Sequence, residues 1–192
     1  MTRIILGLAG QIGAGKQEAA NYLRTRRFLY FSLSDAVRDE ARRRGIKVFT
    51  RKNLQDVGDD LRKKFGLAIL AKRIHRKIMK TKSKKVVIDS IRNPAEVNFL
   101  RGKGEFFLIG VKAKRRIRFE RVRESLRETD VGVKRWREFL RADRRDWGVR
   151  QKSFGQQVGE VMSKADFIID NNKGLKELYE QIERILVKIL KE

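Results

Sequence analysis

The sequence predicts an α/β fold in which a five-stranded parallel sheet lies between two layers of helices. Two observations predict it. Short apolar runs alternate with amphipathic segments along most of the chain, and the first apolar run leads directly into a glycine-rich loop. Strands that alternate with helices form parallel sheets covered on both faces. A chain of 192 residues can bury a sizeable core. We therefore expect residues 1–192 to form one domain.

Five segments have the character of strands. Each is short, rich in aliphatic or aromatic residues, and bounded by polar residues or glycine. The third ends in a carboxylate, and the last is followed by two asparagines. The predicted strands are 4–9, 28–33, 85–89, 106–111 and 165–170.

Helical segments lie between these strands. Ser34 and Asp35 are residues that commonly begin helices, and Pro94 suits a first turn. The last helix follows Gly174 and carries its apolar residues on one face, as docking against a sheet requires. The other predicted helices are 17–23, 35–44, 53–65, 67–80, 94–101, 114–128 and 134–147.

The segment Gly10-Gln-Ile-Gly-Ala-Gly15-Lys16 has the spacing Gly-x4-Gly-Lys between a strand and a helix. Glycines let backbone N–H groups wrap closely around phosphate oxygens, and a lysine here reaches the β- and γ-phosphates. The alternative is a plain glycine-rich turn. The pattern favours binding of a nucleoside triphosphate, and the expected contacts are Gly10, Gln11, Gly13, Ala14, Gly15, Lys16, Gln17 and, after the last strand, Asn171.

Two residues are candidate magnesium ligands. The motif usually ends in Ser or Thr, whose hydroxyl binds Mg²⁺, and here that place is taken by Gln17. Asp89 ends the strand Val-Val-Ile-Asp, where a carboxylate can hold Mg²⁺ directly or through water. Helix capping is the alternative role of Asp89. We expect Gln17 and Asp89 to bind the metal.

The polar residues that follow each strand should line one cleft, because ligands of parallel sheets bind at the carboxyl ends of strands. Arg92 can grip an acceptor phosphate with its planar fork, unless it is a surface arginine. Arg38 lies where a second substrate would enter. Asp35 is either a helix cap or a general base or metal partner.

With these motifs in this order, the chain resembles the P-loop nucleoside monophosphate kinases. The phosphate loop is followed by Ser34-Asp-Ala-Val-Arg-Asp-Glu40 and then by Val87-Ile-Asp-Ser-Ile-Arg92. The likeness is greater to the dephospho-CoA-kinase-like and deoxynucleotide-kinase-like branch. Four further segments carry it, so that it spans nearly the whole chain: 53–62, 89–97, 155–158 and 165–171.

The resemblance implies a three-layer P-loop NTPase fold with a helical lid at about 115–148, and it implies ATP and Mg²⁺ as cofactors. It assigns Lys16 to the phosphates of ATP, and Arg38 and Arg92 to the phosphate of the acceptor. In the lid, Arg123, Arg127 and Arg141 compete for the charge of the transferred phosphoryl group. Together with the residue-based role of Asp35, we expect Lys16, Asp35, Arg92 and Arg127 to be catalytic, and Asp35, Arg38 and Arg92 to bind the acceptor. Two departures stand out: Gln17 replaces the usual hydroxyl, and the segment after Asp89 lacks the proline of adenylate kinases, so the acceptor need not be AMP.

Charge is the second informative feature. Lys and Arg number 48 against 24 Asp and Glu, a net charge of +24, and residues 61–85 hold eleven basic residues and no carboxylate. Such a surface attracts polyanions, and nucleic acid is a candidate partner. An enzyme that handles two phosphorylated substrates also needs cations around its cleft. Composition alone does not separate these interpretations.

Composition also excludes some classes of function. The chain has no cysteine, which rules out disulfides, thiolate metal sites and cysteine nucleophiles, and no apolar run is long enough to span a membrane. No signal-peptide pattern is seen, so we expect a cytoplasmic protein.

The sequence therefore predicts ATP-dependent phosphoryl transfer to a nucleotide-like acceptor, with a (deoxy)nucleoside monophosphate as first choice and dephospho-CoA as the alternative acceptor. The rival from another class is a nucleic-acid- or ribosome-associated ATP-binding switch with little kinase activity. Oligomeric state is left open.

Overall fold

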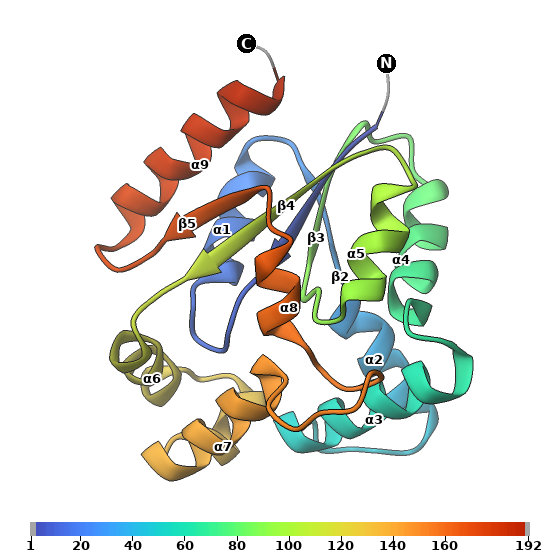
Figure 1. The fold of residues 1–192 in the computed structure, drawn as a ribbon, viewed down its shortest axis with the longest axis vertical. Coiled ribbons are helices and arrows are strands. Elements are labelled where there is room, and N and C mark those ends of the chain that lie inside the picture. Colours follow the sequence, from blue (N-terminus) through green and yellow to red (C-terminus); the bar gives the residue numbers. More distant parts are fainter. Residues whose placement is uncertain (1–2, 191–192) are drawn as a thin grey trace.

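The computed structural model describes residues 3–190. These residues form one five-stranded sheet, which lies at the centre of the structure (Figure 1). All neighbouring strands are parallel. This confirms the predicted fold class. The strands, in their order across the sheet, are β2 (Leu29–Ser32), β3 (Lys85–Asp89), β1 (Ile4–Ala9), β4 (Glu105–Lys112) and β5 (Phe167–Asp170).

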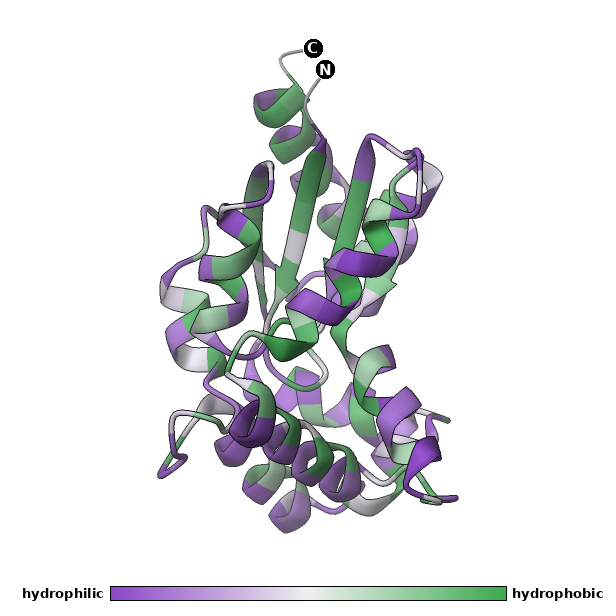
Figure 2. Cartoon of the chain, turned by 90° about the vertical axis from the view of Figure 1, so that its right-hand side faces the viewer, coloured by the Kyte–Doolittle hydropathy of each residue, from purple (hydrophilic) through white to green (hydrophobic). Residues whose placement is uncertain are grey.

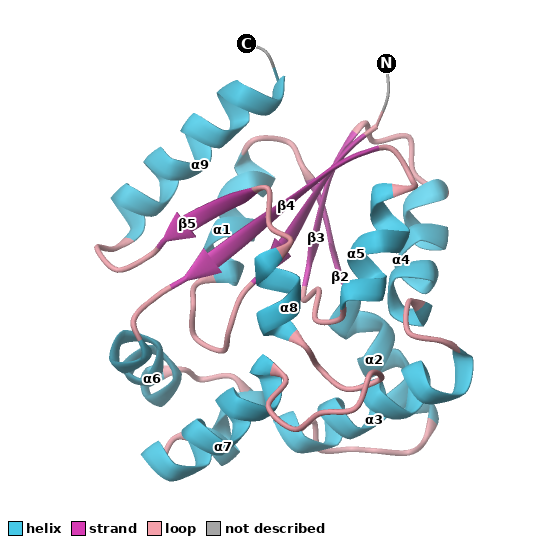
Figure 3. Ribbon diagram, viewed as in Figure 1, coloured by secondary structure: helices cyan, strands magenta, loops and turns pink. Residues whose placement is uncertain are grey.

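Helices cover both faces of the sheet, so that the strands lie between two helical layers (Figure 3). Helices α1 (Lys16–Thr25) and α9 (Leu175–Leu190) pack on one face. The other face is covered by α2 (Leu33–Arg43), α3 (Arg51–Phe65), α4 (Ile69–Met79), α5 (Pro94–Arg101) and α8 (Val158–Ser163).

The central strand shows why both faces are closed. Along β1, Leu6 and Leu8 belong to the cluster under α1 and α9, whereas Ile5 and Ala9 belong to the opposite cluster. Alternate residues of a strand point to opposite faces, and all four are fully buried. In Figure 2 the strands are accordingly hydrophobic along most of their length, while helices at the lower end carry long hydrophilic stretches.

A third, smaller apolar cluster joins the phosphate loop to the segment predicted as a lid. Ile12 packs with Val122, Val133 and Phe139, which come from three successive elements. These elements are α6 (Arg115–Glu124), the 3-10 helix η1 (Glu128–Val133) and α7 (Trp136–Trp147). The phosphate loop and this segment therefore share a core.

The start of α2 differs from the prediction. The strand before it ends at Ser32, and the Ser32 hydroxyl accepts a hydrogen bond from the backbone N–H of Ser34 at 3.2 Å. Ser32 is thus the N-cap, and the expectation that Ser34 or Asp35 begins this helix is wrong. Asp35 lies in the first turn, where its negative charge interacts favourably with the helix dipole.

The helix expected over 114–128 is also too long, since α6 ends at Glu124. Residues 125–128 have good helix propensity, but tertiary contacts outweigh it. Asp130 forms an ion pair with Arg51 of α3, and the Glu128 carboxylate accepts a hydrogen bond from the backbone N–H of Phe49 at 2.8 Å. These contacts prevent α6 from continuing, and the chain forms η1 instead.

Helix α8 was not predicted, because six residues carry too little periodicity to detect.

No helix within residues 3–190 is long and apolar enough to cross a membrane.

The carboxyl ends of the strands all point to the same side of the sheet, toward α6, α7 and α3 in Figure 1.

Glu40 links α2 to α4 and is expected to make the stability of the protein depend on pH. Its buried carboxylate accepts hydrogen bonds from Arg43 at 2.9 Å and Arg44 at 2.8 Å, and it lies 3.4 Å from Arg73 of α4. These hydrogen bonds lower the pKa of Glu40 from 4.5 to about 2, and the bond from Arg43 makes the largest contribution. A lowered folded-state pKa stabilises the protein above the ordinary pKa, and this stability is lost as the pH falls from 4.5 toward 2.

We predict that Glu40→Gln lowers the free energy of unfolding at pH 7 by about 1–2 kcal/mol, a value reduced by solvent screening at the arginines. The measurement is urea denaturation of both proteins between pH 7 and pH 2. The difference should shrink below pH 4.5. Glu180→Gln, at an exposed α9 position, is the control and should change little. A difference that stays constant with pH would contradict the assignment.

Candidate functional site

The phosphate loop has a backbone that only glycine accommodates. Gly13 and Gly15 have φ angles of 74° and 102°. A Cβ at Gly13 would overlap the carbonyl oxygen of Arg118, and one at Gly15 would overlap the side-chain amide of Asn171. Gly15 is also the N-cap of α1 and supplies no side-chain cap. The first N–H groups of α1 are therefore available to an anion.

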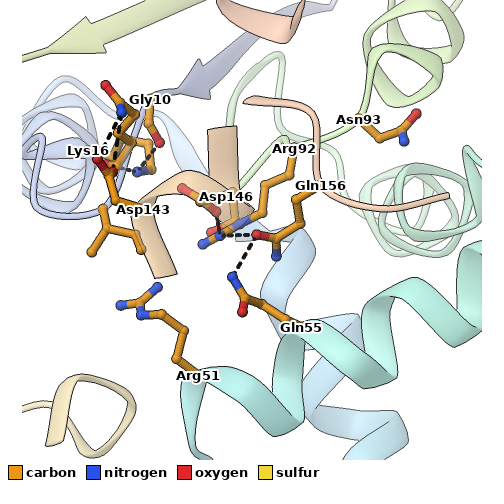
Figure 4. Close-up of polar contacts among 12 residues, drawn as sticks. Gly10, Lys16, Arg51, Gln55, Arg92, Asn93, Asp143, Asp146 and Gln156 are labelled. Carbon is orange, nitrogen blue, oxygen red and sulfur yellow. Dashed lines mark hydrogen bonds and ion pairs between the residues drawn. The ribbon is translucent and has the colours of Figure 1, made fainter. Parts of the chain in front are cut away.

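Lys16 folds back over this loop. Its ammonium group donates to the carbonyl oxygens of Gly10 at 2.7 Å and Gln11 at 3.0 Å (Figure 4). Burial lowers the pKa of Lys16 to about 8, while the nearby Asp89 carboxylate opposes the shift. A phosphate group beside the ammonium would favour its charged form, so the site is suited to an anion.

Asp89 and Gln17 fit the oxygen chemistry of magnesium. Asp89 is buried at the end of β3, and its carboxylate accepts a hydrogen bond from the backbone N–H of Ser90. Ser90 has a φ of 66°, which is unusual outside glycine and marks a strained turn here. The Gln17 amide group donates to the Asn21 side-chain oxygen at 3.1 Å, which leaves the Gln17 carbonyl oxygen as an acceptor.

Within residues 3–190 there is no cluster of three or more His, Cys, Asp or Glu side chains that could hold a metal by themselves. Mg²⁺ commonly takes one or two protein ligands and completes its shell with substrate phosphates and water. The donor set of Asp89 and Gln17 therefore fits a metal that arrives with a nucleotide.

A cleft of about 620 Å³ opens beside the phosphate loop. Its walls come from the loop, from the ends of β2 and β3, and from α2, α3, α6 and η1. Its polar and charged lining includes Lys16, Gln17, Arg38, Arg51, Gln55, Arg62, Asp89, Arg92, Arg121, Arg127 and Gln156.

The wall facing the loop is built from arginines held by buried carboxylates. Arg92 forms an ion pair with Asp146 of α7 and lies 3.4 Å from the Gln156 side-chain oxygen. That oxygen also accepts a hydrogen bond from the Gln55 amide at 3.0 Å (Figure 4). Arg51 is paired with Asp130. The guanidinium groups are oriented before any ligand arrives.

Most of the predicted site residues lie in this cleft. Its lining contains Gly13, Ala14, Gly15, Lys16, Gln17, Arg38, Asp89, Arg92 and Arg127. Of the three lid arginines proposed to reach the phosphoryl group, Arg123 and Arg141 are exposed and do not line the cleft, which leaves Arg127 as the candidate.

Four predicted residues do not line the cleft: Gly10, Gln11, Asp35 and Asn171. Asp35 is half exposed and pairs with Arg38 at 3.2 Å. Asn171 is buried and donates to the Ala14 carbonyl oxygen at 2.9 Å, and the Gln11 amide donates to Asp143 at 3.2 Å. Asn171 and Gln11 thus brace the phosphate loop.

Sequence reasoning missed part of the site. Arg51 and Gln55 lie near the start of α3, and Gln156 lies in a loop, so none of them directly follows a strand. Arg118 and Asp143 were hidden among many charged residues. They form a buried ion pair with distances of 2.6 and 2.9 Å, and Arg118 also donates to the Ile12 carbonyl oxygen at 3.0 Å. Only burial distinguishes this arginine from its neighbours.

Solved structures share this fold over nearly the whole chain. The structure of TT1252 from Thermus thermophilus has a TM-score of 0.62 at 19% identity and covers 98% of this chain and 99% of that one. Shikimate kinase from Bacteroides thetaiotaomicron has a TM-score of 0.60 at 13% identity, with full coverage of both chains. At these identities the likeness shows the fold alone, a three-layer P-loop NTPase fold.

Sequence comparison identifies nearer relatives, although no family model matches the chain. A UPF0200 protein of Pyrococcus horikoshii is 38% identical over 193 residues, which cover 97% of this chain and 98% of the relative. A UPF0200 protein of Hyperthermus butylicus is 32% identical over 187 residues, which cover 97% and 95%. Identity at this level over almost the full length of both proteins is shared by members of one family. The chain therefore belongs to the UPF0200 protein family.

Proposed function

We propose that this protein is an ATP-dependent kinase that phosphorylates a nucleotide-like acceptor, with a (deoxy)nucleoside monophosphate as the first choice. One observation carries the proposal. A single cleft is lined both by the phosphate loop with Lys16 and by an arginine wall, Arg38, Arg51 and Arg92. A donor phosphate and an anionic acceptor can then meet within it.

At the donor end, the loop N–H groups and Lys16 bind the phosphate chain of ATP. Arg127 lines the cleft, is exposed and forms no ion pair with any residue in the range 3–190, so its charge is available to the transferred group. Asp89 and Gln17 would hold Mg²⁺, which supplies charge neutralisation when bound. The segment 115–148 is proposed to act as a lid that excludes water.

At the acceptor end, cations dominate and a general base is missing from the predicted place. A phosphate acceptor is already ionised and needs orientation and charge neutralisation. A hydroxyl acceptor such as that of dephospho-CoA also needs a group to take its proton. Asp35, the proposed base, is paired with Arg38 and does not line the cleft. This placement favours a phosphate acceptor.

The first test is ADP formation from ATP and Mg²⁺ with a panel of acceptors: ribo- and deoxynucleoside monophosphates, dephospho-CoA and shikimate. We expect acceptor-dependent turnover with at least one nucleoside monophosphate. Lys16→Ala should lower kcat/KM by about 100-fold or more, because it removes a cation at the transferred phosphate. ATP binding with no acceptor-dependent turnover across the panel would overturn the kinase proposal.

A matched pair of arginines on α2 tests the acceptor wall. Arg38 and Arg42 each pair with the aspartate three residues earlier, both at 3.2 Å, but only Arg38 lines the cleft. We predict that Arg38→Ala raises the KM for the acceptor about 10- to 100-fold, the value of one charge-assisted hydrogen bond, with little change in the KM for ATP. Arg42→Ala should leave both constants near those of the wild type. Equal effects of the two substitutions would contradict the assignment of Arg38.

Asp35→Asn separates the two kinds of acceptor. The substitution keeps the side-chain size and removes the ability to take a proton. If the acceptor is a phosphate, kcat should fall by less than about fivefold, well below the 10²- to 10⁴-fold that a general base contributes. Steady-state kinetics with the best acceptor of the panel gives the answer. A loss of 100-fold or more would support a hydroxyl acceptor and the alternative substrate.

A further inference from the structure

Helix α7 carries four arginines and three acidic residues. Its aspartates point inward, where Asp143 pairs with Arg118 and Asp146 pairs with Arg92, and both are buried. Both aspartates are thus used for internal structure, whereas Glu138 is half-buried and forms no ion pair within residues 3–190. Of the four arginines, Arg145 pairs with Asp56 and Asp59 of α3, and the other three remain on the outer surface.

Three arginines, Arg137, Arg141 and Arg144, form that outer surface. All three are exposed, and none forms an ion pair within the described range 3–190. At 100° per residue, they fall within about 60° of one another around the helix axis. Ion-pair networks that stabilise proteins combine both signs of charge, and this arrangement does not. The three guanidinium groups therefore form a cationic stripe, which we call the α7 stripe.

Two aromatic rings border the stripe. Trp136 and Trp147 are the first and last residues of α7 and the only tryptophans of the chain. They lie on the flank of the helix next to the arginines, roughly 60–80° away from Arg144 at 100° per residue. They are 40% and 42% exposed. Trp136 packs against Phe119 and Phe139, at centroid distances of 4.9 and 5.8 Å, so this ring is held in place while part of it stays open.

We infer that the α7 stripe, with its flanking tryptophans, binds single-stranded nucleic acid. Arginines spaced along one face neutralise successive phosphates, and fixed, partly open aromatic rings provide stacking surfaces for unpaired bases. Neither feature serves the cleft, because none of these five residues lines it. The inference does not depend on the proposed kinase activity.

A second basic surface offers a control for net charge. Lys72, Arg76 and Lys80 of the α4 region are also exposed and form no ion pair within residues 3–190. They carry the same charge as the α7 stripe but have no tryptophan beside them. A bulk attraction from the net charge of +24 would use both surfaces equally.

The test compares two triple variants of the full chain, Arg137→Gln/Arg141→Gln/Arg144→Gln and Lys72→Gln/Arg76→Gln/Lys80→Gln. The probe is a fluorescein-labelled 20-nucleotide single-stranded RNA of mixed sequence, titrated at several salt concentrations. Losing three phosphate contacts should flatten the slope of log K against log[salt] by about 2 and weaken binding about 100-fold at 0.1 M salt. The α4 variant should keep a slope and affinity much closer to the wild type. Thermal unfolding of both variants checks that they fold.

Intrinsic fluorescence gives an independent readout, since both tryptophans of the chain belong to α7. Saturable quenching of wild-type fluorescence by unlabelled RNA is the expected result, with quenching shifted to higher RNA concentration in the α7 variant. Equal losses of RNA affinity in the two variants would overturn the inference. So would binding of vesicles that contain phosphatidylserine in place of the RNA.

Discussion

The buried ion pair between Arg118 and Asp143 connects the phosphate loop to the helices that follow the fourth strand. The Arg118 guanidinium donates a hydrogen bond to the carbonyl oxygen of Ile12, and the Asp143 carboxylate accepts one from the side-chain amide of Gln11. Removing either partner would leave an uncompensated charge in the interior, at a cost of about 3–5 kcal/mol. Ile12 also makes apolar contacts with α6, η1 and α7, and the Arg118 guanidinium lies 5.6 Å from the centre of the Phe139 ring in this cluster. The loop conformation, the position of α7 and the pairing of Arg92 all depend on it.

Buried carboxylates set the geometry of the cleft. Asp130 and Asp146 each hold an arginine that faces the cleft, and Glu96 holds Arg62 at 2.9 Å. A guanidinium that is fixed in this way loses less conformational entropy when a ligand binds. The chain has half as many acidic as basic residues, and seven of the acidic side chains are buried, so the outer surface is left with a strong excess of positive charge. The same distribution that orders the cleft also produces the α7 stripe.

Local patterns were sufficient for the elements that carry strong periodicity or a dense motif. The five strands, the phosphate loop and the last helix could be predicted because each is encoded by neighbouring residues: a short apolar run, closely spaced glycines, or a repeating apolar face. Errors appeared where distant contacts compete with local preference. The segment after Glu124 has helical propensity, yet Asp130 and Glu128 are held by residues about 80 positions away.

The sequence by itself determined the fold class, the phosphate loop, and the placement of Lys16, Asp89 and Arg92 at one edge of the sheet. Residues that follow parallel strands must meet there, whatever the rest of the chain does. Only the tertiary structure decided which arginines face the cleft, that Asp35 turns aside toward Arg38, and that Arg118 is internal while Arg137, Arg141 and Arg144 are not. All 48 basic residues carry a positive charge. What distinguishes one from another is how deeply it is buried and which partners it has, and both depend on the packing of segments that are distant in the sequence.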